Sequence, residues 1–206
     1  MIYRKQVRGV GAEVRFAAEV EAHAHEQRFW TRTIPTWTSP RLVHNDPSTL
    51  ELDFTRVEGQ ALTWAEGPLL ATRLAAAAAT VPSQIRIHGD LHPGNVLVAG
   101  GVWCVVDWEL SRPGEFGEEL GALLAHALLA FGRGQLSPGA LEQVASPIEA
   151  LLGTARARGL ALQDLGRQTE RERAVRDAAR VAERVLLIST WSSRWALDRP
   201  ANGVTL

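Results

Sequence analysis

The sequence predicts an α+β protein with two lobes. Residues 1–60 are expected to form a reduced N-terminal lobe of few strands and one helix, and residues 61–206 a larger, mainly helical lobe. Three observations lead to this prediction. Strand-like alternation is concentrated near the N-terminus, two short apolar runs meet at Gly100-Gly101 as in a hairpin, and apolar residues recur at helical spacing almost everywhere after Pro113.

Each element of the N-terminal lobe follows from a local pattern. Residues 1–7 alternate as in a strand, and residues 12–30 place apolar side chains at helical spacing. Pro, Thr and Ser make residues 33–49 a predicted loop, with a short strand at 40–46 before a turn. Residues 49–57 alternate clearly and are expected to form a further strand.

The C-terminal lobe is expected to begin with a helix over residues 63–81. Thr63 followed three residues later by Glu66 has the spacing of a capping box, and Pro82 ends the apolar run. The segments that follow are a short strand, a hairpin and three helices, predicted at residues 84–87, 95–107, 118–132, 138–159 and 164–197.

Composition excludes several classes of protein. The chain has 22 basic and 23 acidic residues, a balance that favours neither nucleic acid nor an acidic membrane surface as partner. No run reaches the roughly 18 apolar residues of a membrane span, and the start lacks the apolar core of a secretory signal. Cys104 is the only cysteine and is interpreted as a buried thiol. A cytoplasmic location is therefore expected, and the oligomeric state is not indicated.

A dense group of polar residues interrupts the apolar runs between residues 85 and 109, IRIHGDLHPGNVLVAGGVWCVVDWE. Asp90 follows a predicted strand, Asn95 enters the hairpin and Asp107 leaves it. Because a hairpin brings its open ends together, Asn95 and Asp107 are expected to approach each other near Asp90. Oxygen ligands of this kind suit Mg²⁺, and a spare carboxylate can orient or deprotonate an attacking hydroxyl.

This segment resembles the catalytic loop and metal-binding segment of the aminoglycoside phosphotransferase and choline kinase family, relatives of protein kinases. The match lies in His88, Asp90, Asn95 and Asp107, the pattern His-x-Asp, four residues, Asn, then Asp after a hairpin. The resemblance implies a protein-kinase-like fold and transfer of the ATP γ-phosphate to a small-molecule hydroxyl, on an aminoglycoside, amino alcohol or sugar, with ATP and Mg²⁺ as cofactors. Asp90 would be the catalytic carboxylate, Asn95 and Asp107 the Mg²⁺ ligands, and His88 a structural residue.

The resemblance extends to other positions. His92 stands where protein kinases have a Lys and would lie near the transferred phosphate, and Glu109 matches a frequent second acid that would touch metal or substrate. Lys5 and Glu19 resemble the phosphate-binding Lys and its Glu partner on the following helix. Glu119 stands where the family often has Asp, and the segment after the strand at 49–57 resembles the hinge that lines the adenine pocket.

Alternatives remain open in the first lobe. Strand alternation puts Arg4 and Lys5 on opposite faces, so either is a candidate for the inward cation, and Glu13 and Glu21 compete with Glu19. The family also places a Gly-rich hairpin over the phosphates, before the Lys strand. Only four residues precede Lys5, so we expect either a minimal lobe or a start inside a longer reading frame.

Three other functions compete with small-molecule phosphotransfer. One is a non-catalytic nucleotide-binding protein that kept the fold without the Gly-rich loop. A second is a small atypical protein kinase, which the absence of an Ala-Pro-Glu-like segment after Asp107 disfavours. The third is a zinc hydrolase using His88 and His92, which would need a helix that Gly89 and Pro93 disfavour.

Overall fold

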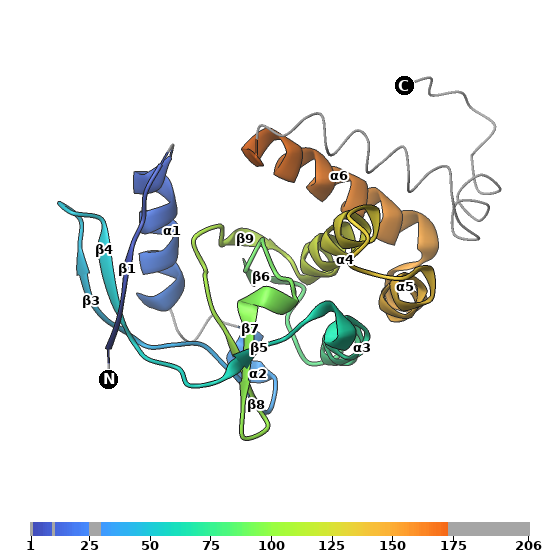
Figure 1. Cartoon of the computed structure of the whole chain (residues 1–206), viewed down its shortest axis with the longest axis horizontal. Helices are drawn as coiled ribbons and strands as arrows, with labels where there is room; N and C mark the ends of the chain where they lie inside the picture. The colour runs from blue at the N-terminus through green and yellow to red at the C-terminus, as the bar shows by residue number, and fades with distance from the viewer. Residues whose placement is uncertain (1, 10, 25–29, 173–206) are drawn as a thin grey trace.

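The N-terminal lobe is a three-stranded antiparallel sheet covered by one helix (Figure 1). The computed structural model describes residues 2–9, 11–24 and 30–172. The sheet has the order β1-β4-β3, and the elements of the lobe are β1 (Ile2–Gln6), α1 (Ala12–Ala24), β3 (Leu42–Asp46) and β4 (Glu51–Thr55). A small core holds helix and sheet together, formed by Val7, Ala12, Phe16, Leu52 and Phe54.

A second sheet links the lobes. It has the order β2-β8-β7-β5, built from β2 (Trp37–Thr38), β5 (Gln60–Ala61), β7 (Val96–Ala99) and β8 (Val102–Val105). The predicted hairpin is confirmed: β7 pairs antiparallel with β8, and both turn glycines have positive φ, 56° and 82°. Cys104 lies buried on β8, and burial raises the pKa of its thiol to about 12, as expected of a core thiol.

The C-terminal lobe is mainly helical and is built around α4 (Figure 1). This helix is apolar on nearly all sides and packs against the three other long helices of the lobe. The elements of the lobe are η2 (Trp64–Glu66), α3 (Gly67–Ala77), β6 (Gln84–Ile87), η3 (Pro93–Asn95), β9 (Arg112–Glu115), α4 (Phe116–Gly132), α5 (Pro138–Leu152) and α6 (Thr154–Glu172).

The predicted α+β architecture is confirmed, with local differences. The capping box at Thr63 and Glu66 is present, but it caps a 3-10 turn ahead of α3. The helix predicted over 138–159 is two helices, because Gly153 takes a positive φ of 77° between them. The division at residue 60 remains a prediction.

Three strands were not predicted, and all depend on partners far away in the sequence. β5 lies at the predicted boundary between the lobes and pairs antiparallel with β7. β2 lies in the predicted loop, next to the short α2 (Trp30–Thr33), and pairs parallel with β8, where the Trp37 and Trp103 rings lie 5.3 Å apart. β9 pairs with β6, just before the helical region. Residues 25–29 of the first predicted helix and 173–197 of the last lie outside the described residues.

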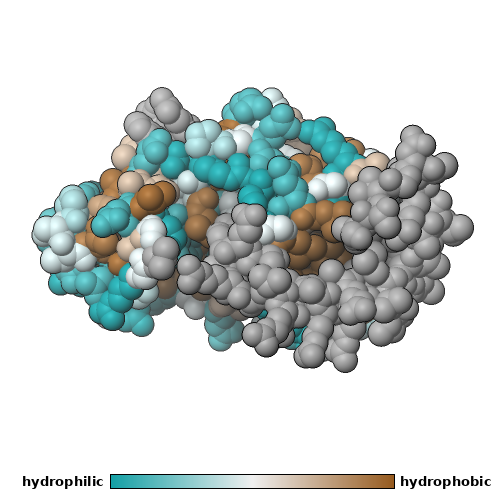
Figure 2. All heavy atoms as spheres, turned by 90° about the horizontal axis from the view of Figure 1, so that it is seen from above, coloured by the Kyte–Doolittle hydropathy of each residue, from teal (hydrophilic) through white to brown (hydrophobic). Residues whose placement is uncertain are grey.

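One face of the molecule is mostly hydrophilic where the structure describes it (Figure 2). Figure 2 shows hydrophilic residues over most of the described part of one face, with apolar residues in smaller groups between them. Exposed apolar side chains of this kind are ordinary on a protein surface. Within the described residues, no helix is both long and apolar enough to span a bilayer.

Candidate active site

The loop after β6 is held to the hairpin by His88, whose side chain is buried. Its Nε2 lies 2.8 Å from the Val106 carbonyl oxygen, and its Nδ1 lies 3.2 Å from the backbone nitrogen of Asp90. Burial lowers the pKa of His88 and favours the neutral ring. A neutral imidazole has one donor and one acceptor, so Nε2 donates to Val106 while Nδ1 accepts from Asp90.

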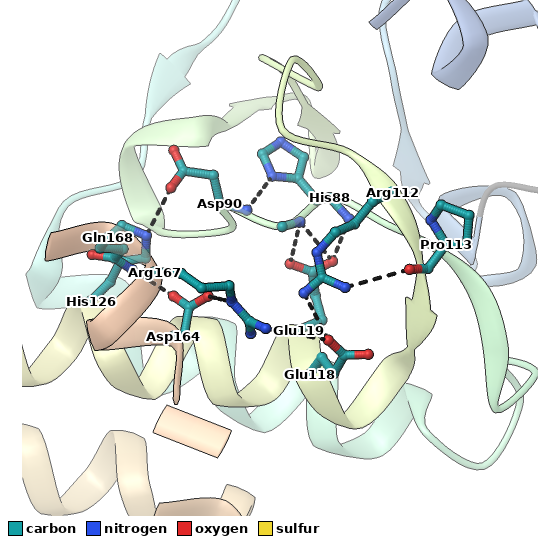
Figure 3. Close-up of polar contacts among 11 residues, drawn as sticks. His88, Asp90, Arg112, Pro113, Glu118, Glu119, His126, Asp164, Arg167 and Gln168 are labelled. Atoms are coloured by element: carbon teal, nitrogen blue, oxygen red, sulfur yellow. Dashed lines mark hydrogen bonds and ion pairs between the residues drawn. The ribbon is translucent and has the colours of Figure 1, made fainter. Parts of the chain in front are cut away.

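Glu119 on α4 holds the same loop from below (Figure 3). Its fully buried carboxylate accepts hydrogen bonds from the backbone nitrogens of His88, at 2.5 Å, and Gly89, at 3.2 Å. Burial raises the pKa of Glu119 to about 8, although both backbone donors favour the charged form. The buried core therefore fixes the start of the loop that carries Asp90 through its main chain.

Gly89 is required at its position for two reasons. Its φ is +78°, and a Cβ there would lie 2.6 Å from the Leu110 carbonyl oxygen. Gly134 has a similar φ of +74° but open space around it. We expect Gly134→Ala to cost about 1 kcal/mol of unfolding free energy and Gly89→Ala clearly more, because it adds a backbone clash. Denaturant unfolding measures both, and equal losses would contradict the clash.

Asn95 and Asp107 lie at the open end of the hairpin, as predicted. The Asn95 side-chain nitrogen donates to the Asp90 carbonyl oxygen over 3.0 Å, and the Asn95 carbonyl oxygen accepts from the Val106 nitrogen over 3.0 Å. Asp107 follows with a positive φ of 69°, uncommon for a residue with a side chain. The Asn95 amide oxygen and the Asp107 carboxylate are the groups that would ligate a cation.

Lys5 is the inward cation of the first lobe. Its Nζ lies 2.7 Å from Glu19 Oε2, also contacts Asp107, and lies 3.5 Å from Glu109 Oε2. Arg4 instead pairs with Asp53, at 2.7 Å. Burial alone would lower the pKa of Lys5, but Glu19 and Asp107 raise it, so the ammonium stays charged.

Glu19 is the helix acid that meets Lys5. Of its competitors, Glu21 pairs with Arg86 at 2.9 Å and Glu13 is exposed. Burial, with the charges of Asp107 and Glu109 as smaller causes, raises the pKa of Glu19 to about 7, although Lys5 lowers it.

The site has an excess of negative charge. Carboxylate oxygens of Glu19, Asp107 and Glu109 all lie within 4.8 Å of one another, a grouping that the sequence had predicted only in part. Besides Lys5, Arg15 approaches Glu109 at 3.7 Å. Oxygen donors crowded in this way fit a hard cation such as Mg²⁺. The arrangement therefore contains a charged ammonium group next to a cluster of carboxylates of the kind that ligate metals.

Two hollows are lined by residues of the loop between β6 and β7. The first, of about 630 Å³, lies between the lobes and is lined by Lys5, Glu19, Asn95, Asp107 and the segment Thr55, Arg56 and Val57 among others. The second, of about 370 Å³, is lined by Trp64, Asp90, His92, Leu110, His126, Leu129, Ala130, Arg133, Gln135 and Gln168. The loop thus places the Asn95 side chain at the first hollow and the Asp90 side chain at the second.

His92 lines the second hollow beside Asp90. Its Nδ1 accepts a hydrogen bond from the Gly94 nitrogen over 3.1 Å. Burial, and then the charge of His126, lower the pKa of His92 to about 4, so the ring is neutral and Nε2 carries its proton. His88 and His92 do not share a helix, which removes the geometry that the zinc hydrolase hypothesis required.

His126 is a site residue that the motif did not reveal. It lies on α4, 36 residues after Asp90, with Nε2 3.2 Å from Asp90 Oδ1 (Figure 3). Its ring centroid is 4.7 Å from that of His92. The sequence did carry a signal: His126 is the only polar side chain in the apolar run 120–132, seven residues after Glu119 and therefore on the same helix face.

Comparison with solved structures shows what the fold is similar to. An aminoglycoside phosphotransferase, a thermostable mutant of APH(4)-Ia with ADP and hygromycin B, matches with a TM-score of 0.53 at 16% identity, over 79% of this chain and 80% of that one. A choline/ethanolamine kinase family protein from Mesorhizobium loti matches with a TM-score of 0.51 at 14% identity, over 95% and 85%. Choline kinase LicA from Streptococcus pneumoniae gives 0.50 at 13%, over 88% and 86%.

Identities this low establish the fold alone, and they confirm the predicted kinase-like fold. No curated protein sequence matches the chain. The sequence evidence for a family comes instead from a family model, described as the phosphotransferase enzyme family APH, which matches residues 40–160. The matched region is more than half of the chain and contains the whole catalytic loop, the hairpin and Asp107, so the chain belongs to the APH phosphotransferase enzyme family.

Proposed function

We propose that this protein transfers the γ-phosphate of ATP to a hydroxyl group of a small molecule. One observation carries the proposal: a single loop and hairpin bring Asp90 to one hollow, and Asn95 with Asp107 to the cleft beside it. Two substrates bound in adjoining hollows would meet at this loop. Phosphoryl transfer needs such positioning more than it needs covalent chemistry from the protein.

The cleft between the lobes supplies complementary charges for a nucleotide. Lys5, held by Glu19 at 2.7 Å, would contact the α- and β-phosphates. Asn95 and Asp107 would hold Mg²⁺, and Glu109 is close enough to join them. Bound Mg²⁺ would neutralise charge on the phosphates. Lys5 and Asp107 form an ion pair with each other in this structure. With Mg²⁺ and ATP bound, Lys5 would contact phosphate and Asp107 would contact the cation.

Asp90 would act on the acceptor. Burial alone would raise its pKa, but the hydrogen bond and charge of His126 lower it below its ordinary value, so the carboxylate is ionised at neutral pH. It would accept a hydrogen bond from the acceptor hydroxyl. As the new phosphorus–oxygen bond forms and the bond to the β-phosphate oxygen breaks, ADP leaves and the hydroxyl proton passes to Asp90. His92 Nε2–H would donate to the transferred phosphate.

The acceptor would occupy the second hollow. We propose an aminoglycoside, an amino alcohol or a sugar, the classes that the family resemblance implies, and a cytoplasmic location where ATP is available. The described residues around this hollow include one carboxylate, Asp90, and one guanidinium, Arg133, together with uncharged Trp64, Gln135 and Gln168. A first acceptor panel should therefore include neutral sugars as well as cationic molecules.

Calorimetric titration with ATP, with and without Mg²⁺, tests the nucleotide site. We expect binding that depends on Mg²⁺ and that Asp107→Ala weakens at least about tenfold, because the variant loses a carboxylate ligand. Glu142→Gln, an exposed acid on α5, is the matched control and should bind as the wild type does. Equal affinity of wild type and Asp107→Ala, or no binding at millimolar ATP, would reject the proposed site.

Turnover separates the catalytic proposal from its strongest alternative. ADP formation in the presence of an acceptor panel is expected for the wild-type chain. Binding of Mg²⁺ and ATP without any ADP formation would instead identify a non-catalytic nucleotide-binding relative.

A further inference from the structure

We propose that His126 is a positioning residue for the catalytic carboxylate. Its Nε2–H holds Oδ1 of Asp90 and so leaves Oδ2 to receive the proton of the acceptor hydroxyl. The inference rests on the proposed function, in which Asp90 is that carboxylate. No part of the catalytic motif includes His126, which lies on a different element of the lobe.

The direction of the hydrogen bond follows from the chemistry of the His126 imidazole and the Asp90 carboxylate. Nε2 lies 3.2 Å from Oδ1, within hydrogen-bond reach. A carboxylate has no proton to donate and can only accept, so the proton between them belongs to His126. Both side chains are largely shielded, with exposed fractions of 17% for His126 and 26% for Asp90. A charge-assisted hydrogen bond in such a place is stronger than one at the surface.

The support behind His126 is rigid. Glu119 and His126 lie seven residues apart on one face of α4, which is buried over most of its length. Glu119 holds the backbone at His88 and Gly89, while His126 holds the Asp90 side chain (Figure 3). One helix therefore fixes both the main chain of the loop and the carboxylate that the loop presents.

Several other groups face this pair. His88 and His92 approach from the loop. Arg133, the residue that follows the end of α4, and Gln168 on α6 line the same hollow. Asp164, also on α6, is occupied by Gln168 Nε2 at 2.7 Å and by Arg167 Nε at 3.3 Å. Among the described residues, His126 is the side chain that hydrogen-bonds the Asp90 carboxylate.

A purely structural role is the competing interpretation, since a buried histidine needs a partner wherever it lies. The two roles differ in what a substitution changes. His126→Phe keeps a ring of similar volume and removes the donor, whereas His126→Gln removes the ring and keeps an N–H donor at a similar reach. If His126 positions Asp90, His126→Gln should recover the turnover that His126→Phe loses. If His126 only fills space, His126→Phe should keep turnover and His126→Gln should lose it. His44→Gln, on the exposed strand β3, is the control.

The first measurement is ATP turnover by ADP release at saturating Mg²⁺, with water as acceptor, so that no acceptor needs to be known. We expect kcat to fall roughly ten- to a hundredfold in His126→Phe with the KM for ATP nearly unchanged, and partial recovery in His126→Gln. A wild-type chain without turnover both with water and with the acceptor panel would overturn the proposed function. Turnover that His126→Phe leaves unchanged would overturn this inference alone.

The second measurement reports the hydrogen bond without catalysis. A ¹³C NMR titration of the Asp90 carboxyl group is expected to give a higher pKa in His126→Phe than in the wild type, with His126→Gln between them. The acid limb of the pH–rate profile should shift to higher pH in the same order, from the wild type through His126→Gln to His126→Phe. An Asp90 pKa that is equal in wild type and His126→Phe contradicts the inference, whatever the turnover.

Discussion

Asp90→Asn is expected to lower phosphate transfer by roughly 10²–10⁴-fold while ATP affinity stays within about twofold of wild type. Asn has nearly the shape of Asp and still offers an oxygen to His126, so the loop should keep its geometry. It does not accept the hydroxyl proton, however, and it places no negative charge beside the attacking oxygen. Initial rates of ADP formation, with titration calorimetry on the same preparations, measure the two quantities.

The contrast with the cleft residues makes this prediction specific. Asp90 lines the second hollow, whereas Lys5 and Asp107 line the cleft between the lobes. Asp90→Asn should therefore change the rate, and Asp107→Ala should change the Mg²⁺-dependent affinity. Asp46→Asn, a partly exposed acid at the end of β3, is expected to change neither. If Asp90→Asn weakened ATP binding as strongly as it slowed turnover, Asp90 would belong to the nucleotide site.

Local patterns predicted the geometry of the loop and hairpin well, because the residues that meet there come from one short stretch. Gly89 supplies a backbone that only glycine adopts there without a clash, and the Gly100-Gly101 turn closes the hairpin. Asn95 and Asp107 therefore meet as soon as the hairpin forms. Few contacts with distant parts of the chain are needed, so the positions of these residues can be predicted from the sequence.

The first lobe was harder to predict, since three acids and two cations were equivalent by spacing alone. Strand pairing resolves the choice: Arg4 lies opposite Asp53 and pairs with it, whereas Lys5 lies opposite the fully buried Leu52 and turns to the cleft. The orientation of α1 about its own axis then places Glu19 next to Lys5. Both outcomes depend on register and packing, which the sequence does not display.

Residues that act from a distance left the weakest signals. His126 and the strands β2 and β9 make contacts with partners far along the chain, and no local period reports such contacts. His126 was visible only as a polar residue in an apolar helix, a pattern that an ordinary core histidine shares. The role of Glu119 was suggested only by its position in the family pattern.

Glu119→Ala is expected to lower the unfolding free energy by about 2–5 kcal/mol and to abolish turnover. The substitution leaves the buried backbone nitrogens of His88 and Gly89 without their acceptor, at about 1–3 kcal/mol each, and adds a small cavity. Urea denaturation followed by circular dichroism measures the loss. Glu118→Ala, the adjacent and partly exposed acid, separates this effect from a general loss of charge on α4.

Glu119→Gln tests the same contact through its pH dependence. The pKa of Glu119 is raised from 4.5 in the unfolded chain to about 8 in the fold, so the folded protein holds a proton that the unfolded chain has released. Its contribution to stability is therefore full below pH 4.5 and falls as the pH rises toward 8. Glutamine accepts both hydrogen bonds and does not titrate. The stability difference, wild type minus variant, should thus decrease steadily across this range, and a difference independent of pH would show that Glu119 is ionised in the folded protein at every pH tested.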